Sequence, residues 1–214
     1  MKEDKFELIR IIVYNIFGDS MNSIKENTNS KIEIKKSIFY TDMFFIESEE
    51  DIDYYLKKIK EKYKDAKHYC YAYILEEKKH FSDDGEPSGT AGIPILNVLE
   101  KNQLNHILCI VTRYFGGILL GAGGLVRAYT KGVTEALSNT KITPLTPAFL
   151  IEVIFPYDST RKVDSILNKT EICQKKFEEN VCYHLFIPSD QYNLYIDQLT
   201  PYIIKINIIK SCFL

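Results

Sequence analysis

The chain has 214 residues, of which 45% are hydrophobic and 26% charged, and its formal net charge is −2. This length and apolar content are sufficient for a buried core and exclude a wholly disordered chain. The balanced charge excludes a uniformly basic nucleic-acid-binding surface, and no apolar run approaches the roughly 20 residues that a membrane-spanning helix needs. The five cysteines are odd in number and form no C-x-x-C motif, so we expect a reduced, cytoplasmic protein.

Residues 1–30 are interpreted as an N-terminal extension. The apolar stretch at residues 8–17 is interrupted by Arg10 and Asn15 and lacks a small-residue cleavage site, which argues against a secretory signal. Met21 is a candidate for the true start of translation, because the polar residues after it lead directly into the first strand-like segment. A genuine N-terminal helix or tail is the alternative.

Residues 31–140 are predicted to form one domain. Hydrophobic periodicity predicts, in chain order, a strand or hairpin over 33–47, a helix over 47–63, a strand over 68–76, a short helix over 93–100, a buried strand over 106–112 and a helix over 125–137. Ser48 is positioned to cap the first helix. Two loops interrupt the pattern, a polar one over 81–92 and a glycine-rich one over 113–124.

A domain boundary is predicted within residues 141–147, which contain two prolines and no strong period. The last part, residues 147–214, predicts strands and helices in the order strand 149–155, helix 158–168, strand 170–177, strand 180–187, helix 190–199 and strand 203–210. This βαββαβ order is typical of a ferredoxin-like domain. The sequence therefore predicts an α+β protein.

The polar loop concentrates three carboxylates, Asp83, Asp84 and Glu86, among hydroxyl side chains. Hard oxygen ligands of this kind suit a divalent cation, and paired carboxylates also suit general acid–base chemistry. The spacing does not match an EF-hand. The structural alternative is a tight loop whose Asp and Ser side chains cap its own turns and the next helix.

The glycine-rich loop is basic: residues 101–140 carry a net charge of +3, whereas residues 77–100 carry −3. Glycines directly before a helix expose backbone N–H groups to an anion such as phosphate, and arginine adds charge-assisted contacts. The signal for a nucleotide is weak, because neither a Walker A sequence nor a spaced G-x-G-x-x-G occurs. A packing corner between two backbones is the alternative. The candidate phosphate- or nucleic-acid-binding residues are Arg113, Tyr114, Phe115, Gly116, Gly117, Gly121, Gly123, Gly124, Arg127 and Lys131.

His68 and Cys70 share one face of the predicted strand over 68–76. A Cys–His nucleophilic pair can be imagined there. However, neighbours two apart on a strand point in parallel directions, and no third orienting group is evident. A buried cysteine beside a hydrogen-bonded histidine is the preferred interpretation.

Three ordered motifs carry a resemblance to a known family. They are His68-x-Cys70-x-Ala72, the run from Phe81 through Ser-Asp-Asp-Gly-Glu-Pro-Ser-Gly-Thr-Ala-Gly to Leu96, and the run from Val111 through Thr-Arg-Tyr-Phe-Gly-Gly and Leu-Gly-Ala-Gly-Gly-Leu-Val-Arg to Tyr129. These closely resemble the YigZ/Impact family over about residues 30–140, and residues 147–212 resemble the small C-terminal domain of its bacterial members. One departure is Ile118-Leu119, where the family has Ile-Lys.

The resemblance implies an N-terminal α/β domain with the fold of the second domain of ribosomal protein S5. It also implies a ferredoxin-like domain similar to the C-terminal domains of elongation factor G. Both of those relatives bind RNA or the ribosome, and eukaryotic Impact regulates translation through protein partners. The resemblance does not by itself establish an activity.

Our leading hypothesis is an RNA- or ribosome-binding factor linked to the regulation of translation. The helix start near Gly123 would hold phosphate, and Tyr114, Phe115 and Tyr129 would be available for stacking. One open alternative is a phosphate- or nucleotide-dependent enzyme in which Asp83, Asp84 and Glu86 position Mg²⁺ or act as a base, with His68 a further catalytic candidate. Another is a protein-interaction regulator without pocket chemistry. No resident cofactor or metal and no membrane partner are expected.

Overall fold

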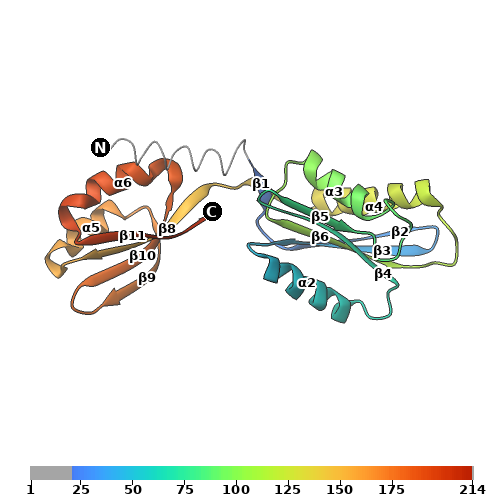
Figure 1. Cartoon of the computed structure of the whole chain (residues 1–214), viewed down its shortest axis with the longest axis horizontal. Helices are drawn as coiled ribbons and strands as arrows, with labels where there is room; N and C mark the ends of the chain where they lie inside the picture. The colour runs from blue at the N-terminus through green and yellow to red at the C-terminus, as the bar shows by residue number, and fades with distance from the viewer. Residues whose placement is uncertain (1–20, 214) are drawn as a thin grey trace. The chain divides into compact units, whose positions relative to one another are not determined.

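The computed structural model describes residues 21–213, and its contacts divide them between Pro144 and Leu145 (Figure 1). We name residues 21–144 the N-terminal unit and residues 145–213 the C-terminal unit. The elements of the N-terminal unit are β1 (Asn22–Ile24), β2 (Thr28–Ile34), β3 (Ser37–Phe45), α2 (Glu49–Lys62), β4 (His68–Leu75), β5 (Lys78–Ser82), α3 (Gly92–Lys101), β6 (Ile107–Tyr114), α4 (Ala122–Ser138) and β7 (Ile142–Pro144). No helix among the described residues is long and apolar enough to cross a membrane.

The N-terminal unit is built on a five-stranded sheet in the order β2-β3-β6-β4-β5, in which all neighbours are antiparallel. Its central strand β6 is buried on both faces. Ile107, Cys109 and Val111 belong to the core on one side, and Leu108 and Ile110 to the core on the other. This double burial explains why the strand is a continuous apolar run rather than an alternating one.

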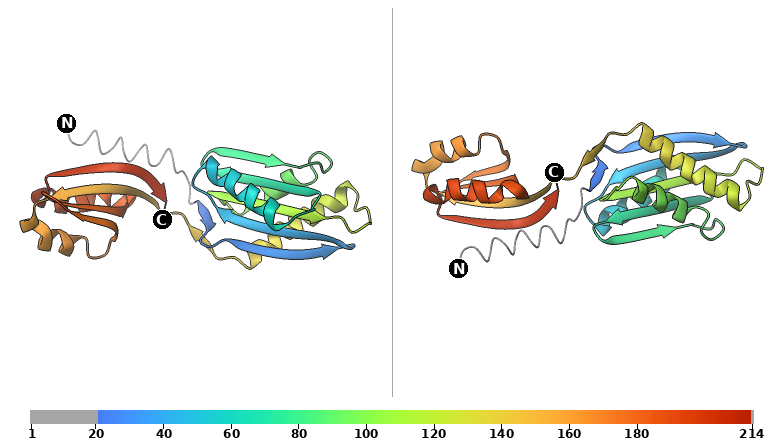
Figure 2. Two further views of the ribbon diagram at one scale, coloured as in Figure 1. Left: turned by 90° about the horizontal axis from the view of Figure 1, so that it is seen from below. Right: turned by 90° about the horizontal axis from the view of Figure 1, so that it is seen from above.

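Helices cover both faces of this sheet, α2 on one side and α3 with α4 on the other (Figure 2). The start of α2 agrees with the prediction: Ser48 accepts a hydrogen bond from the backbone N–H of Asp51, and the Asp51 carboxylate accepts one from the N–H of Ser48. This reciprocal capping satisfies donors that the first helical turn leaves unpaired. Gly132 of α4 lies close to β3, since a Cβ there would be 3.0 Å from Thr41 Oγ1.

The C-terminal unit contains β8 (Pro147–Phe155), α5 (Thr160–Ile166), β9 (Glu171–Phe177), β10 (Val181–Pro188), α6 (Tyr192–Leu199) and β11 (Lys205–Phe213), with short 3₁₀ turns at Tyr157–Ser159, Ser189–Gln191 and Thr200–Tyr202. Its antiparallel sheet has the order β11-β8-β10-β9, and its core lies under α5 and α6. The βαββαβ order and the predicted α+β class are confirmed.

The structure corrects several predicted boundaries. Residues 22–24 and 28–34, partly assigned to an N-terminal extension, form β1 and β2; β1 pairs with β7, and β2 is an edge strand of the large sheet. β5 occupies the start of the predicted polar loop. Exposed residues alternate along β2, and four of the five residues of β5 are exposed, so the hydrophobic periodicity of both strands is weak. The hypothesis that translation starts at Met21 concerns residues 1–20, which lie outside the described residues.

Candidate functional site

A pocket of about 350 Å³ opens on the N-terminal unit where β6 ends and α4 begins. It gathers residues from all three sequence motifs: the start of β4, the polar loop, and the glycine-rich segment after β6. The residues that line it are Lys67, His68, Glu86, Pro87, Arg113, Phe115, Leu119, Leu120, Gly121, Ala122 and Leu125. The structure therefore brings together five of the candidate residues, namely His68, Glu86, Arg113, Phe115 and Gly121.

An ion pair between Arg113 and Glu86 forms one wall of the pocket. Arg113 Nη1 donates to Glu86 Oε1 at 2.6 Å, and the two side chains are only 6% and 3% exposed. The guanidinium carbon also lies 5.5 Å from the ring centre of Phe39 and 5.6 Å from that of Phe115. Arg113 was predicted in a loop as a free phosphate ligand. It lies instead at the end of β6, with its charge neutralised by Glu86.

Tyr129 and Cys70 extend the polar cluster beneath this pair. The Tyr129 hydroxyl donates to Glu86 Oε1 at 2.8 Å, and Cys70 Sγ lies 3.3 Å from that hydroxyl. Burial raises the pKa of Cys70 to about 12, so the thiol stays protonated near neutral pH. Burial likewise raises the pKa of Tyr129. Tyr129 is fully buried and does not offer a stacking surface, contrary to our expectation.

The three carboxylates of the polar loop diverge. Asp83 accepts hydrogen bonds from the backbone N–H groups of Gly89, Ala91 and Gly92 at 2.8–2.9 Å. Burial alone would raise the pKa of Asp83, but these three bonds outweigh it and the pKa lies below its ordinary value. Asp84 Oδ2 accepts from the N–H of Tyr69 at 2.6 Å. Asp83 therefore holds the loop and the start of α3, as the structural alternative expected.

His68 is held at the rim of the pocket. Its Nδ1 lies 2.8 Å from the backbone carbonyl oxygen of Asp84, so Nδ1 carries the donated proton if the imidazole is neutral. No hydrogen bond joins His68 to Cys70 among the described contacts, and Cys70 Sγ lies 2.9 Å from the carbonyl oxygen of Asp83. This arrangement does not form a Cys–His nucleophilic pair.

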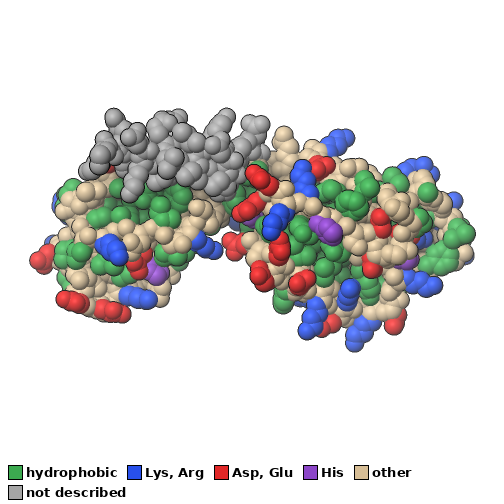
Figure 3. Space-filling model, in the orientation of Figure 1, with side chains coloured by type: hydrophobic (Ala, Val, Ile, Leu, Met, Phe, Trp, Pro, Cys, Tyr) green, Lys and Arg blue, Asp and Glu red, His purple; other side chains and the backbone are tan. Residues whose placement is uncertain are grey.

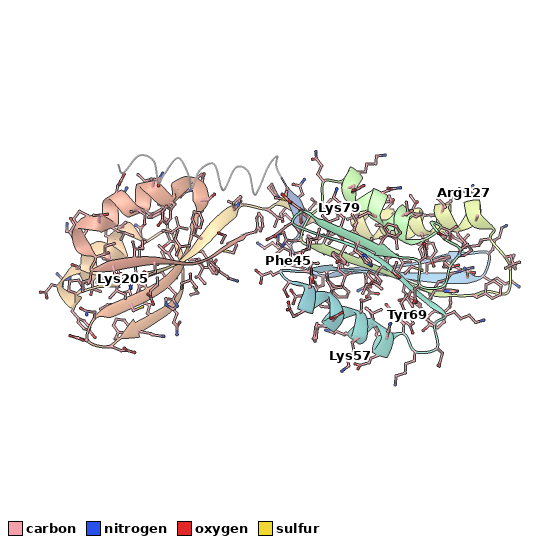
Figure 4. The ribbon with its side chains drawn as sticks, in the orientation of Figure 1. Phe45, Lys57, Tyr69, Lys79, Arg127 and Lys205 are labelled. Carbon is pink, nitrogen blue, oxygen red and sulfur yellow. The ribbon has the colours of Figure 1, made fainter. Side chains whose placement is uncertain are left out.

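The remaining candidate residues lie in two other places. Tyr114 projects to the α2 side of the sheet, where its hydroxyl donates to the carbonyl oxygen of Lys64 at 2.8 Å. Arg127 and Lys131 are exposed on α4 and line a separate shallow groove of about 290 Å³. Figure 4 labels Arg127 on α4. The predicted phosphate-binding set is thus divided among a pocket, a helix surface and the opposite face of the sheet.

The glycines of the basic loop have distinct structural roles. Gly116 packs against the turn before β3, because a Cβ built there would lie 2.0 Å from the carbonyl carbon of Lys36. Gly117 and Gly121 adopt φ values of +82° and +69°, which other residues rarely accept. Gly121 precedes α4, whose start has no side-chain cap. The first N–H groups of α4, including those of Gly123 and Gly124, therefore have no side-chain partner in the part of the chain that the structure describes.

Three polar residues of the site, Lys67, Ser37 and Tyr129, were not among the predicted binding or catalytic residues. Lys67 lines the pocket, and Ser37 Oγ accepts from the N–H of Gly116 at 3.1 Å and lies 3.5 Å from Arg113 Nη2. Tyr129 was considered only for stacking. The sequence did contain a signal for the role of Tyr129. Periodicity places this tyrosine on the apolar side of an amphipathic helix, and a buried hydroxyl needs a hydrogen-bond partner.

Comparisons with known proteins agree with these motifs. Residues 35–137 match the model of the Impact N-terminal domain. The chain is 35% identical to the IMPACT family member YvyE of Bacillus subtilis over 83% of this chain and 84% of that protein. It is 33% identical to YigZ of Escherichia coli over 73% of this chain and 80% of that protein. A crystal structure of a hypothetical protein matches 89% of this chain and 98% of its own, with 28% identity and a TM-score of 0.65. The chain belongs to the IMPACT family.

Proposed function

We propose that this protein binds RNA of the translation apparatus, holding the phosphate backbone on the exposed face of α4 and in the glycine-rich segment before it. The observation that carries the proposal is the pair Arg127 and Lys131. Both side chains are exposed, lie one helical turn apart and line one groove. Among residues 21–213 neither forms an ion pair, and the groove, which Glu135 also lines, keeps a net charge of +1 that favours an anion.

The pocket next to this groove suits a single nucleotide. Pocket and groove both include residues from the first turns of α4, because Leu125 lines the one and Val126 the other. Phe115 and Leu119, which are 43% and 82% exposed, offer apolar surface to a base. The uncapped start of α4 offers N–H groups to its phosphate. An RNA strand with one nucleotide in the pocket would pass its neighbouring phosphates over Arg127.

The charge distribution supports a small footprint. On the face drawn in Figure 3, Lys and Arg side chains are interspersed with Asp and Glu. Two free cations on one helix predict modest affinity and a shallow dependence on salt, rather than that of a long basic groove. Regulation of translation, which the family resemblance implies, would then follow from occupying a limited RNA site.

The geometry favours binding over catalysis. A phosphate-dependent enzyme needs free carboxylates for Mg²⁺ or for a base. Asp83 is occupied by three backbone N–H groups, and Glu86 by Arg113 and Tyr129. Asp84 is exposed and accepts the N–H of Tyr69 at one oxygen, which leaves a single carboxylate in place of the set that such an enzyme needs. A protein-interaction regulator remains the outcome if RNA does not bind.

Co-sedimentation of the full chain with ribosomes and with total RNA, at low and moderate salt, tests the proposal. The informative variant is Arg127→Glu/Lys131→Glu, which reverses two exposed charges without touching the buried cluster. Its matched control is Lys57→Glu/Lys60→Glu on α2, the helix that covers the opposite face of the sheet. Both of these lysine side chains are exposed (Figure 4 labels Lys57). Arg113→Glu is unsuitable, because it would break a buried ion pair.

We expect binding that weakens with salt, at least about tenfold loss in the α4 variant, and nearly unchanged binding in the α2 control. An equal loss of binding in both variants would mean that nonspecific electrostatic attraction, and not the surface of α4, holds the RNA. Absence of binding by the unmodified protein at both salt concentrations would overturn the proposal.

A further inference from the structure

The C-terminal unit carries Glu152, Cys182 and His184 on the sheet face that its helices leave uncovered. On β8, Ile151 and Val153 point into the core, so Glu152 between them faces the other way. On β10, Tyr183 is a core residue, and its neighbours Cys182 and His184 share the opposite face. His184 is directly opposite Glu152 in the β8–β10 register. Strand pairing therefore places the three side chains side by side.

Two of the three distances between the donor atoms of these side chains are close to the edges of a tetrahedral metal site, and the third is at most 4.8 Å. Glu152 Oε1 lies 3.3 Å from His184 Nε2 and 3.7 Å from Cys182 Sγ. All three donor atoms lie within 4.8 Å of one another, and no other group of three such residues within 21–213 does so. Zinc binds nitrogen and oxygen at about 2.0–2.1 Å and sulfur at about 2.3 Å, so the edges of its tetrahedron measure about 3.3–3.6 Å. One ion fits between these atoms with small side-chain adjustments.

A hydrogen bond orients the Glu152 carboxylate, and no described Lys or Arg side chain competes for it. Asn207 Nδ2, from β11, donates to Glu152 Oε2 at 2.7 Å and leaves Oε1 facing His184 and Cys182. Such outer hydrogen bonds fix the direction of metal ligands. Among the described residues, Glu152 forms no ion pair with Lys or Arg. Its side chain is 28% exposed and that of His184 is 21% exposed, so solvent reaches the site.

We propose that Glu152, Cys182 and His184 bind Zn²⁺, with water completing the tetrahedron. Imidazole, thiolate and carboxylate are the three ligand types that zinc takes in proteins, and a site with three protein ligands keeps one position open. Cysteine binds as the thiolate, so its proton is released to solvent on binding. The site is independent of the proposed RNA surface, which lies on the N-terminal unit.

Titration of the reduced, full-length protein with Co²⁺, followed by Zn²⁺, tests this site. Co²⁺ takes the same ligands and reports on them through a thiolate-to-cobalt charge-transfer band and the visible bands of tetrahedral coordination. We expect both features at one equivalent of Co²⁺ and their loss when Zn²⁺ is added. Cys182→Ser should remove the charge-transfer band, and Glu152→Gln and His184→Ala should each weaken binding at least tenfold.

Two further variants distinguish a specific metal site from nonspecific binding of metal ions to the protein surface. Cys173→Ser is the matched control, because Cys173 is exposed on the neighbouring strand β9 and lies outside the donor group. Its Sγ lies 3.2 Å from the carbonyl oxygen of His184, a contact that the serine hydroxyl can keep, so the spectrum should be unchanged. Asn207→Ala should keep the charge-transfer band and weaken affinity about tenfold through the lost orientation of Glu152. No charge-transfer band in the unmodified protein, or a band that survives in Cys182→Ser, would overturn the proposal. Circular dichroism of each variant verifies that it remains folded.

Discussion

Glu86 and Arg113, which are 27 residues apart in the chain, form an ion pair at 2.6 Å that is almost completely buried. Glu86 also accepts the hydroxyl hydrogen bond of Tyr129. A charge-paired, hydrogen-bonded carboxylate of this kind connects the polar loop, the central strand and α4. The pair therefore forms one wall of the pocket and also fixes the positions of the three elements around it.

Removing one member of the pair should destabilise the protein strongly. Arg113→Ala leaves the Glu86 carboxylate buried without its cation, for which we expect a loss of about 3–5 kcal/mol in the free energy of unfolding. Urea unfolding followed by circular dichroism measures it. Lys79→Ala removes one member of the exposed Lys79–Glu100 pair and should change that free energy by less than about 1 kcal/mol. Equal effects of the two substitutions would contradict the structural role of the buried pair.

The carboxylate of Asp83 should contribute a pH-dependent part of the stability. Its folded-state pKa is lowered, so its contribution is present above the unfolded-state pKa and is lost as pH falls through the folded-state value. Asp83→Asn places an amide N–H₂ group against backbone donors and should cost about 1–3 kcal/mol at neutral pH. We expect the difference from the unmodified protein to shrink below about pH 4. Denaturant titrations at several pH values measure this difference; a constant difference would contradict the prediction.

Two neighbouring glycines should respond differently to alanine. At Gly116 the added methyl group meets the backbone of Lys36 at 2.0 Å, so β3 or the loop must move. Overpacking of this kind costs about 1–3 kcal/mol. At Gly117 the space is open and only the φ of +82° is unfavourable, for which we expect about 1 kcal/mol. Thermal unfolding of both variants tests whether Gly116→Ala is the more destabilising substitution. A larger loss of stability in Gly117→Ala would refute the close approach at Gly116.

The cysteines should differ in reactivity. Cys70 is buried and its pKa is raised to about 12 by burial, and burial raises the pKa of Cys109 as well. Cys173 is exposed. Alkylation of the native protein at neutral pH, followed by peptide mass spectrometry, should label Cys173 and spare Cys70 and Cys109. Labelling of all three after denaturation is the control. Rapid native labelling of Cys70 would contradict its burial beneath the pocket.

The sequence predicted those elements whose signal is local. The capping box at Ser48 begins α2 where expected, and the apolar run over 107–111 forms the central strand. Weakly periodic edge strands such as β2 and β5 were missed wholly or in part, because every second residue of β2 and most of β5 are exposed and mainly polar. The family was also predictable, since its motifs are long and ordered.

The chemical state of the site residues depended on the tertiary structure. The sequence alone showed that one glycine-containing loop carries three carboxylates and that a second, glycine-rich one is basic. Only the fold decided that Arg113 is neutralised by Glu86, that Tyr114 faces the other side of the sheet, and that Arg127 forms no ion pair within residues 21–213. The availability of a charged group depends on its burial and on partners distant in the chain, and these are fixed by strand register and helix packing rather than by local spacing.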